Sequence, residues 1–164
     1  MNIKIRPMEL EDFAAWAEIR NLPLASSFTL GIPYISKEEA KKRVEAAVSD
    51  RSVVNIVAEV DDKVVGFAGI HFKRGRRRHT AEIGMMVHDG YQGKGIGTEL
   101  MKRLIDLADN WYNIHRIQLE VYVDNERAIR LYKKFGFVIE GTLKDFAFRN
   151  GKYVDAYVMA RIKD

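Results

Sequence analysis

A glycine-rich segment between a predicted strand and a predicted helix constrains this chain more than any other feature. Four glycines fall within the eight residues from Gly90 to Gly97, and glycine lets a backbone adopt positive φ and approach a ligand closely. No Ser, Thr, Asp or Asn stands directly before Gly95 to cap the helix that begins there, so the first helical amides lack a side-chain acceptor. A bound anion is their natural partner, because the helix dipole favours it too. The segment therefore predicts a phosphate site.

The spacing of these glycines excludes two common phosphate-binding motifs. The string G-x-x-x-x-G-K-[ST] is absent, and Gly93, Gly95 and Gly97 form G-x-G-x-G rather than the dinucleotide fingerprint G-x-G-x-x-G. The segment also follows an antiparallel meander of predicted strands instead of lying in a βαβ repeat. A different phosphate-bearing ligand is indicated.

Hydrophobic periodicity over residues 1–164 predicts one α+β domain with a mixed sheet. The predicted strands span residues 2–6, 53–60, 64–72, 80–88, 117–123, 137–148 and 153–162. The predicted helices span residues 9–20, 36–48, 95–112 and 125–135. The buried face of the third helix is expected to carry Leu100, Leu104, Leu107, Ala108 and Trp111. Residues 21–35 are expected to form an irregular apolar loop that covers or lines a pocket.

Composition excludes several chemistries. The chain has no cysteine, which excludes disulfides, thiolate nucleophiles and Cys-based metal sites, and its four histidines never stand at i, i+4, so no metal is expected. No apolar run approaches the roughly 20 residues of a membrane span, and residues 1–20 contain no signal-peptide core. We therefore expect a cytoplasmic protein without a membrane partner.

The positive charge of the chain is concentrated in one loop. The formal net charge is +4, and the loop contains Lys73, Arg74, Arg76, Arg77 and Arg78. Such a loop predicts either a solvated hairpin tip or a site for a small anion. A nucleic-acid-binding module would need interleaved aromatic residues, and only Phe72 is nearby, so no nucleic-acid partner is expected.

Two segments resemble the signatures of the GNAT superfamily of N-acetyltransferases. Gln92 to Gly97 matches Q/R-x-x-G-x-G/A, and Asn125 to Phe137 matches N-x-x-A-x-x-L-Y-x-x-x-G-F. With the predicted strands between them, the resemblance covers nearly the whole chain. The tail from Arg149 to Arg161 is similar to the bacterial L-amino-acid N-acetyltransferases and the phosphinothricin-acetyltransferase-like group. The resemblance implies the GNAT fold: a mixed, mostly antiparallel sheet of six to seven strands, splayed central strands and about four helices.

The resemblance also implies acetyl-CoA as co-substrate. It places the pyrophosphate at Gln92, Gly93, Lys94, Gly95, Ile96, Gly97 and Thr98. The pantetheine arm is expected along the backbone of Met85, Met86 and Val87, where an N–H near Met86 would face the oxyanion. Asn125 can cap its helix, and the resemblance adds a contact to acetyl-CoA.

Tyr132 is predicted to act as general acid toward the departing thiolate, and it is also expected to contact acetyl-CoA. Helical spacing places it on an apolar face with Ala128, Leu131 and Phe135, which points its hydroxyl into the domain. The alternative is a core tyrosine that donates to a backbone acceptor. Because the chain has no cysteine, direct attack by the amine in a ternary complex is expected.

Three routes remain open for removing the proton from the amine. Glu82 and Glu120 each stand where one branch of the superfamily carries a glutamate base, and both are expected on central strands, where a carboxylate is costly to bury. Each is as readily explained as a hydrogen-bonded structural carboxylate. The third route is deprotonation through water.

The acceptor site is expected under the loop from Leu24 to Tyr34 and the last hairpin. Its predicted lining residues are Leu24, Phe28, Tyr153 and Asp155. The resemblance favours the α-amino group of a small L-amino acid, whose carboxylate has two candidate anchors, Arg20 and one arginine from Arg74 to Arg78.

Alternative functions stay open beside this small-molecule amine acceptor. A protein N-terminal acetyltransferase of the ribosomal-protein type would need an open groove. The other alternative is an acyl-CoA sensor without catalysis. The presence of Tyr132, Asn125 and the complete glycine motif argues against it. The resemblance is also compatible with a homodimer.

Overall fold

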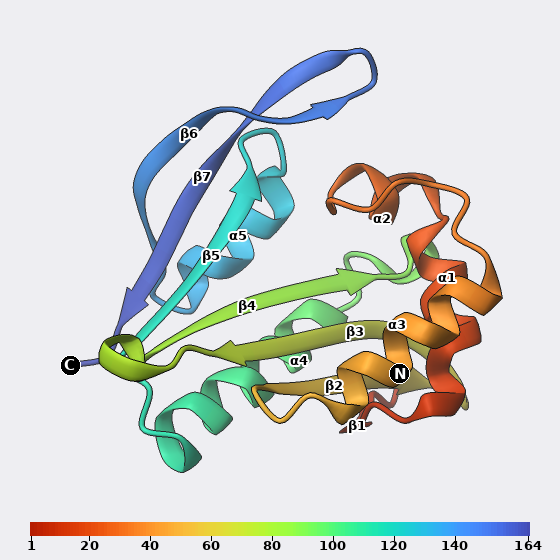
Figure 1. Cartoon of the computed structure of the whole chain (residues 1–164), viewed down its shortest axis with the longest axis horizontal. Coiled ribbons are helices and arrows are strands. Elements are labelled where there is room, and N and C mark those ends of the chain that lie inside the picture. Colours follow the sequence, from red (N-terminus) through yellow and green to blue (C-terminus); the bar gives the residue numbers. More distant parts are fainter.

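The computed structural model describes residues 1–164 and is built on a seven-stranded sheet (Figure 1). The strand order is β1-β2-β3-β4-β5-β7-β6, and β4 and β5 are the one parallel pair among neighbours. The strands are β1 (Lys4–Pro7), β2 (Val53–Val60), β3 (Lys63–Phe72), β4 (Thr80–Val87), β5 (Arg116–Tyr122), β6 (Val138–Arg149) and β7 (Lys152–Ile162). The predicted α+β class and mostly antiparallel mixed sheet are confirmed.

The two parallel strands separate after a short pairing. β4 and β5 pair only from Thr80 to Glu82, opposite residues 116–118, whereas β4 continues to pair with β3 as far as Val87. β5 likewise continues along β7 as far as Tyr122. Figure 1 shows the strands starting side by side near the C-terminus and opening into a V. The predicted splay is confirmed, and it leaves backbone groups of both strands without a ladder partner.

Helices cover the two faces of the sheet. The larger core cluster lies beneath α4 (Ile96–Asp106) and α5 (Glu126–Lys134). α4 approaches β3 closely because Gly66 has no side chain: a Cβ there would lie 2.9 Å from Ile96 Cγ2. The smaller cluster lies beneath α1 (Phe13–Arg20) and α3 (Lys37–Ser49) and includes Phe67 and Met86.

The structure has five α-helices where about four were expected, because a short helix lies inside the segment expected to be irregular. That helix is α2 (Pro23–Ser27), with Pro23 in its first turn. Its amides at Leu24 and Ala25 donate to the Asp89 carboxylate, at 2.9 Å each. Residues 64 or more positions apart make this cap, so local sequence cannot reveal it.

The third predicted helix also ends earlier than the predicted residue 112. α4 stops at Asp106 and a π-helical turn, η4 (Leu107–Trp111), follows. The wider turn rotates the last residues off the buried face. Trp111 is therefore 76% exposed rather than buried as predicted.

Two structural observations bear on the class of protein. None of the helices is both long and apolar enough to cross a membrane. No cluster of three or more His, Asp or Glu side chains is arranged to hold a metal ion.

Candidate active site

A cavity of about 860 Å³ occupies the V between β4 and β5. Its walls come from α1, α2, β3, β4, the glycine segment with the start of α4, β5 and α5. Gly69 on β3 and Gly84 on β4 line it, and a Cβ on Gly84 would meet nothing within 4 Å. The splay of the sheet thus creates a single space that is lined by helices from both faces of the sheet.

The glycine segment forms one end of this cavity with the geometry that an anion requires. Gly93 and Gly95 have φ of 74° and 88°, and a Cβ on either would meet nothing within 4 Å. Gly95 is the N-cap of α4 and no side chain caps the helix. The first paired helical amide is that of Glu99, which donates to the Gly95 carbonyl at 3.1 Å, so the amides of residues 96–98 are free for a ligand. The residues present fit a phosphate group.

Most of the predicted phosphate-site residues line the cavity, and two side chains have other partners. Gln92 donates to the Val87 carbonyl at 3.4 Å and accepts from Arg127 at 2.8 Å. The Lys94 ammonium lies 5.2 Å from the centre of the Tyr91 ring, outside the cavity lining. Arg127, on the first turn of α5, therefore brings a positive charge to the segment that the sequence pattern did not reveal.

The middle of the cavity is lined by the unpaired edge of β4. Met85, Met86 and Val87 all line it, and none of them has a partner on β5. This arrangement suits an extended ligand arm that pairs with the strand.

Tyr132 lies on α5, buried in the larger core cluster, and lines the same cavity. Burial alone shifts the pKa of Tyr132, with no hydrogen bond to its hydroxyl among the causes, so the structure does not have the alternative of a core tyrosine bonded to a backbone acceptor. Burial raises the pKa of Tyr132 to about 12, which keeps the phenol protonated at neutral pH. Asn125 caps α5 as predicted, accepting from the Ala128 amide at 3.3 Å, and also lines the cavity.

The two candidate carboxylates differ in their surroundings. Glu120 lines the cavity and has no ion pair or hydrogen bond, and it is exposed. Glu82 does not line the cavity; its carboxylate accepts from Gln118 at 2.9 Å and pairs with Lys73 at 3.2 Å. Both glutamates lie on central strands, Glu82 on β4 and Glu120 on β5. Neither is buried: Glu120 is exposed and Glu82 is partly exposed.

The predicted acceptor residues divide into two pairs. Leu24 and Phe28 line the cavity, whereas Tyr153 and Asp155 lie outside its lining. β6 bulges between Leu143 and Ala147, and the Asp155 carboxylate accepts there from the Asp145 amide at 2.9 Å. Tyr153 is 69% exposed and packs on Phe148. The prediction that Tyr153 and Asp155 line the acceptor pocket is therefore corrected. Both residues instead make contacts within the last hairpin.

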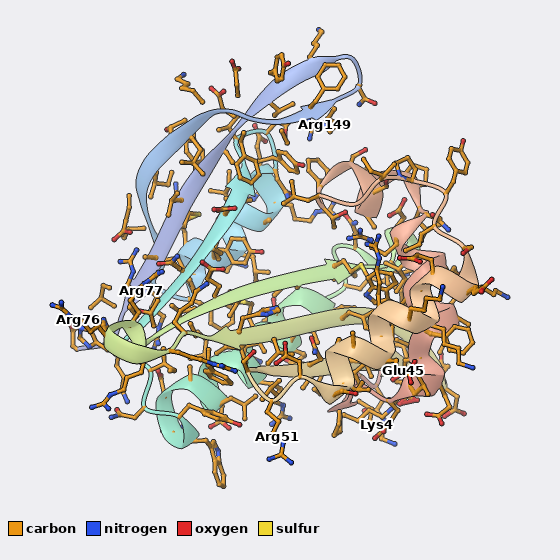
Figure 2. The ribbon with its side chains drawn as sticks, in the orientation of Figure 1. Lys4, Glu45, Arg51, Arg76, Arg77 and Arg149 are labelled. Carbon is orange, nitrogen blue, oxygen red and sulfur yellow. The ribbon has the colours of Figure 1, made fainter.

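Other side chains close the acceptor end of the cavity. Tyr122 donates to the Thr29 carbonyl at 3.0 Å, which ties β5 to the segment after α2. Arg149, labelled in Figure 2 on the last hairpin, donates to the Ser27 carbonyl at 3.2 Å and lies over the Phe28 and Tyr122 rings. No local sequence pattern predicts the roles of Tyr122 and Arg149, because their contacts join segments about 90 to 120 positions apart.

The basic loop lies elsewhere. Figure 2 shows Arg76 and Arg77 at the closed end of the V, with their side chains directed to solvent. None of Arg74 to Arg78 lines the cavity, whereas Arg20 does. Of the two candidate anchors for a substrate carboxylate, the structure places only Arg20 at the cavity.

Comparison with known proteins gives a consistent result. The sequence profile of the acetyltransferase (GNAT) family matches residues 16–137. The L-amino acid N-acetyltransferase AaaT of Escherichia coli (strain K12) is 42% identical over 163 residues, covering 98% of this chain and 98% of that protein.

Two solved structures that carry coenzyme A or its acetyl ester are similar over nearly the whole chain. Spermidine N-acetyltransferase from Vibrio cholerae in complex with CoA and spermine has a TM-score of 0.86 at 28% identity, covering 98% of this chain and 95% of that one. YncA from Salmonella typhimurium with acetyl-CoA has a TM-score of 0.84 at 27% identity, covering 99% and 94%.

The profile match spans both the glycine segment and the tyrosine-bearing helix α5, the two features that meet at the cavity. The two solved structures share the overall fold over nearly the whole chain. The chain therefore belongs to the acetyltransferase (GNAT) family and is an acetyl-CoA-dependent N-acetyltransferase.

Proposed function

We propose that this enzyme transfers the acetyl group of acetyl-CoA to the α-amino group of a small L-amino acid, by direct attack in a ternary complex. The observation that carries the proposal is one continuous cavity that joins the free amides of α4 to the unbonded hydroxyl of Tyr132 and to the pocket under α2. The amino-acid acceptor is supported by the name of the relative that is 42% identical over the full chain.

The chain's own residues would perform the remaining tasks. Acetyl-CoA, when bound, supplies a thioester carbonyl. The amides at the start of α4 would hold the pyrophosphate, and the backbone of Met85 to Val87 would align the arm along β4. An N–H near Met86 would stabilise the developing oxyanion, where loss of one donor typically costs about 2.7–4 kcal/mol.

Two proton transfers complete the proposed reaction. The amine nitrogen forms a bond to the carbonyl carbon and loses a proton to Glu120, directly or through water. The carbon–sulfur bond then breaks as the Tyr132 hydroxyl protonates the sulfur. Glu120 is the better supported of the two carboxylates, because it lines the cavity while Glu82 is engaged by Lys73 and Gln118.

A thiol-release screen tests the proposed function. The enzyme is incubated with acetyl-CoA and with free L-amino acids, polyamines or N-terminal peptides, and release of the CoA thiol is measured. We expect release with free amino acids. Release with polyamines or peptides alone would contradict the proposal. Tight acetyl-CoA binding without any release would instead favour the sensor function.

A further inference from the structure

One arginine lacks the partner that every comparable arginine has. Five arginines are half-buried, and burying a cation is costly unless an anion compensates it. Four of them pair with carboxylates: Arg6 with Asp12, Arg116 with Glu140, Arg149 with Asp124, and Arg161 with Asp109. Arg20 has no such partner: only burial and the like charge of Arg43 shift its pKa, with no carboxylate or hydrogen bond among the causes. No carboxylate of the chain therefore balances its charge.

The surroundings of Arg20 hold its guanidinium in the acceptor part of the cavity. Arg20 ends α1, lines the cavity and lies 5.0 Å from the centre of the Trp16 ring. The backbone of Gly31 lies directly against it: a Cβ on Gly31 would come within 1.9 Å of the guanidinium nitrogen Nη2. No polar side-chain atom of the protein is both fully enclosed and unpaired, so the guanidinium nitrogens remain open to the cavity.

The electrostatics around Arg20 favour the binding of an anion beside its guanidinium. Burial, and secondarily the charge of Arg43, lowers the pKa of Arg20, although a guanidinium stays protonated at neutral pH. The same burial disfavours the cation when no anion is present and strengthens its attraction for one that arrives. A guanidinium also presents two parallel N–H donors that match a carboxylate.

We infer that Arg20 binds the carboxylate of the acceptor and thereby makes the enzyme specific for amines that carry a carboxylate. This inference rests on the proposed function and names the residue that selects its substrate class. An ammonium group would suit the part of the cavity lined by Glu120 on β5. A polyamine would bring a cation to Arg20 instead, and the two charges would repel.

The test compares an acid with its neutral analogue in matched variants. The substrates are the free L-amino acid that gives the highest kcat/KM in the thiol-release screen and the primary amide of that amino acid. They are assayed with wild type, Arg20→Gln, Arg20→Lys and Gly31→Ala. Arg43→Ala serves as control, because it removes the neighbouring charge and its exposed ion pair with Glu39 while leaving the cavity intact.

We expect Arg20→Gln to lower kcat/KM for the free acid roughly 30-fold or more, through a raised KM, since one partner of a desolvated charge pair is removed. The amide should change little. Arg20→Lys should recover part of the loss, and Gly31→Ala should show the same selective loss because it displaces the guanidinium. Arg43→Ala should match wild type. The KM for acetyl-CoA and the melting temperature should stay near wild type in all variants.

Two other outcomes have separate meanings. Suppose that wild type acetylates free amino acids, but that Arg20→Gln lowers kcat/KM equally for the acid and the amide, or changes it for neither substrate. The assignment of Arg20 is then wrong while the proposed function stands. If wild type acetylates no free amino acid, the proposed function is wrong and the inference about Arg20 is overturned with it.

Discussion

At the scale of single residues, chemistry in this enzyme depends on side chains that the fold leaves without partners. Tyr132 is buried among apolar side chains, yet its hydroxyl has no hydrogen bond and lines the cavity. Glu120 is also without a partner, whereas Glu82 is engaged. A polar group that lines the cavity and has no protein partner is available to a ligand, whereas Glu82 is already held by protein partners.

Tyr132→Phe should lower kcat about 100-fold or more, the usual contribution of a positioned general acid, and should leave the KM for acetyl-CoA nearly unchanged. Because burial raises the pKa of Tyr132 to about 12, the protonated form persists as the pH rises, so Tyr132 should produce no fall in kcat below about pH 10. Steady-state kinetics against pH would check both points. Tyr112→Phe, at a ring stacked on Phe72 away from the cavity, is the control. An unaltered kcat for Tyr132→Phe would remove Tyr132 from the mechanism.

Glu120→Gln and Glu82→Gln should have different effects on the pH–rate profile. We expect Glu120→Gln to lower kcat/KM for the acceptor and to shift the rising limb, because it removes the carboxylate that faces the cavity. Glu82→Gln should retain the wild-type profile, since its carboxylate pairs with Lys73. The reverse result would make Glu82 the base. If neither variant shifts the limb, deprotonation through water is the better description.

At the scale of elements, the start of α4 is built to receive an anion. Glycines with positive φ turn the chain into the helix, and no side chain caps it. The neighbouring α2 shows the opposite arrangement, because a distant carboxylate, that of Asp89, satisfies its first amides. The acceptor for the first amides of α2 is therefore a protein carboxylate, whereas the acceptor for those of α4 is expected to be a ligand.

Gly95→Glu should abolish acetyl-CoA binding and leave a folded protein. The added carboxylate would stand where the phosphate is expected and would repel it. Gly151→Glu is the matched control, because Gly151 also has positive φ, of 76°, and open space at its Cβ position, but lies in the turn between β6 and β7. Calorimetric titration with acetyl-CoA and a thermal melt would separate binding from folding. Equal affinity in the two variants would refute the phosphate assignment.

At the scale of the whole molecule, a sheet whose central strands separate needs strong stabilising contacts elsewhere. One tie is at the first strand, where Arg6 donates to the Asp12 carboxylate at 2.8 and 2.9 Å and also pairs with Glu59 on β2. Asp12 further accepts from the Glu9 amide at 2.8 Å. These bonds join β1, β2 and the start of α1, far from the cavity.

This tie predicts how stability depends on pH. Burial of Asp12 works to raise its pKa, but the hydrogen bonds from Arg6 and the Glu9 amide outweigh it, and the pKa is lowered. The unfolded chain therefore binds the proton more tightly, so the stabilisation is complete above the ordinary aspartate value of about 3.9 and is lost as the pH falls through the lowered pKa.

Asp12→Asn should lower the free energy of unfolding at pH 7 by about 1.5–3 kcal/mol, the range for hydrogen bonds to charged groups. It should also flatten the loss of stability in acid. Urea unfolding at several pH values would measure both effects, with Asp164→Asn at the chain end as control. A variant as stable as wild type at pH 7 would contradict this account.

The sequence by itself determined what depends on neighbours along the chain: the strands, the uncapped glycine entry of α4, the Asn125 cap and the apolar face that carries Tyr132. Periodicity and capping act over a few residues, so they are readable without a fold. Tertiary structure decided which groups end up with partners. It satisfied Glu82 and Asp155, turned Tyr153 and Trp111 to solvent, and left Arg20 and the Tyr132 hydroxyl facing a cavity. These outcomes depend on contacts between distant segments, and no local pattern encodes them.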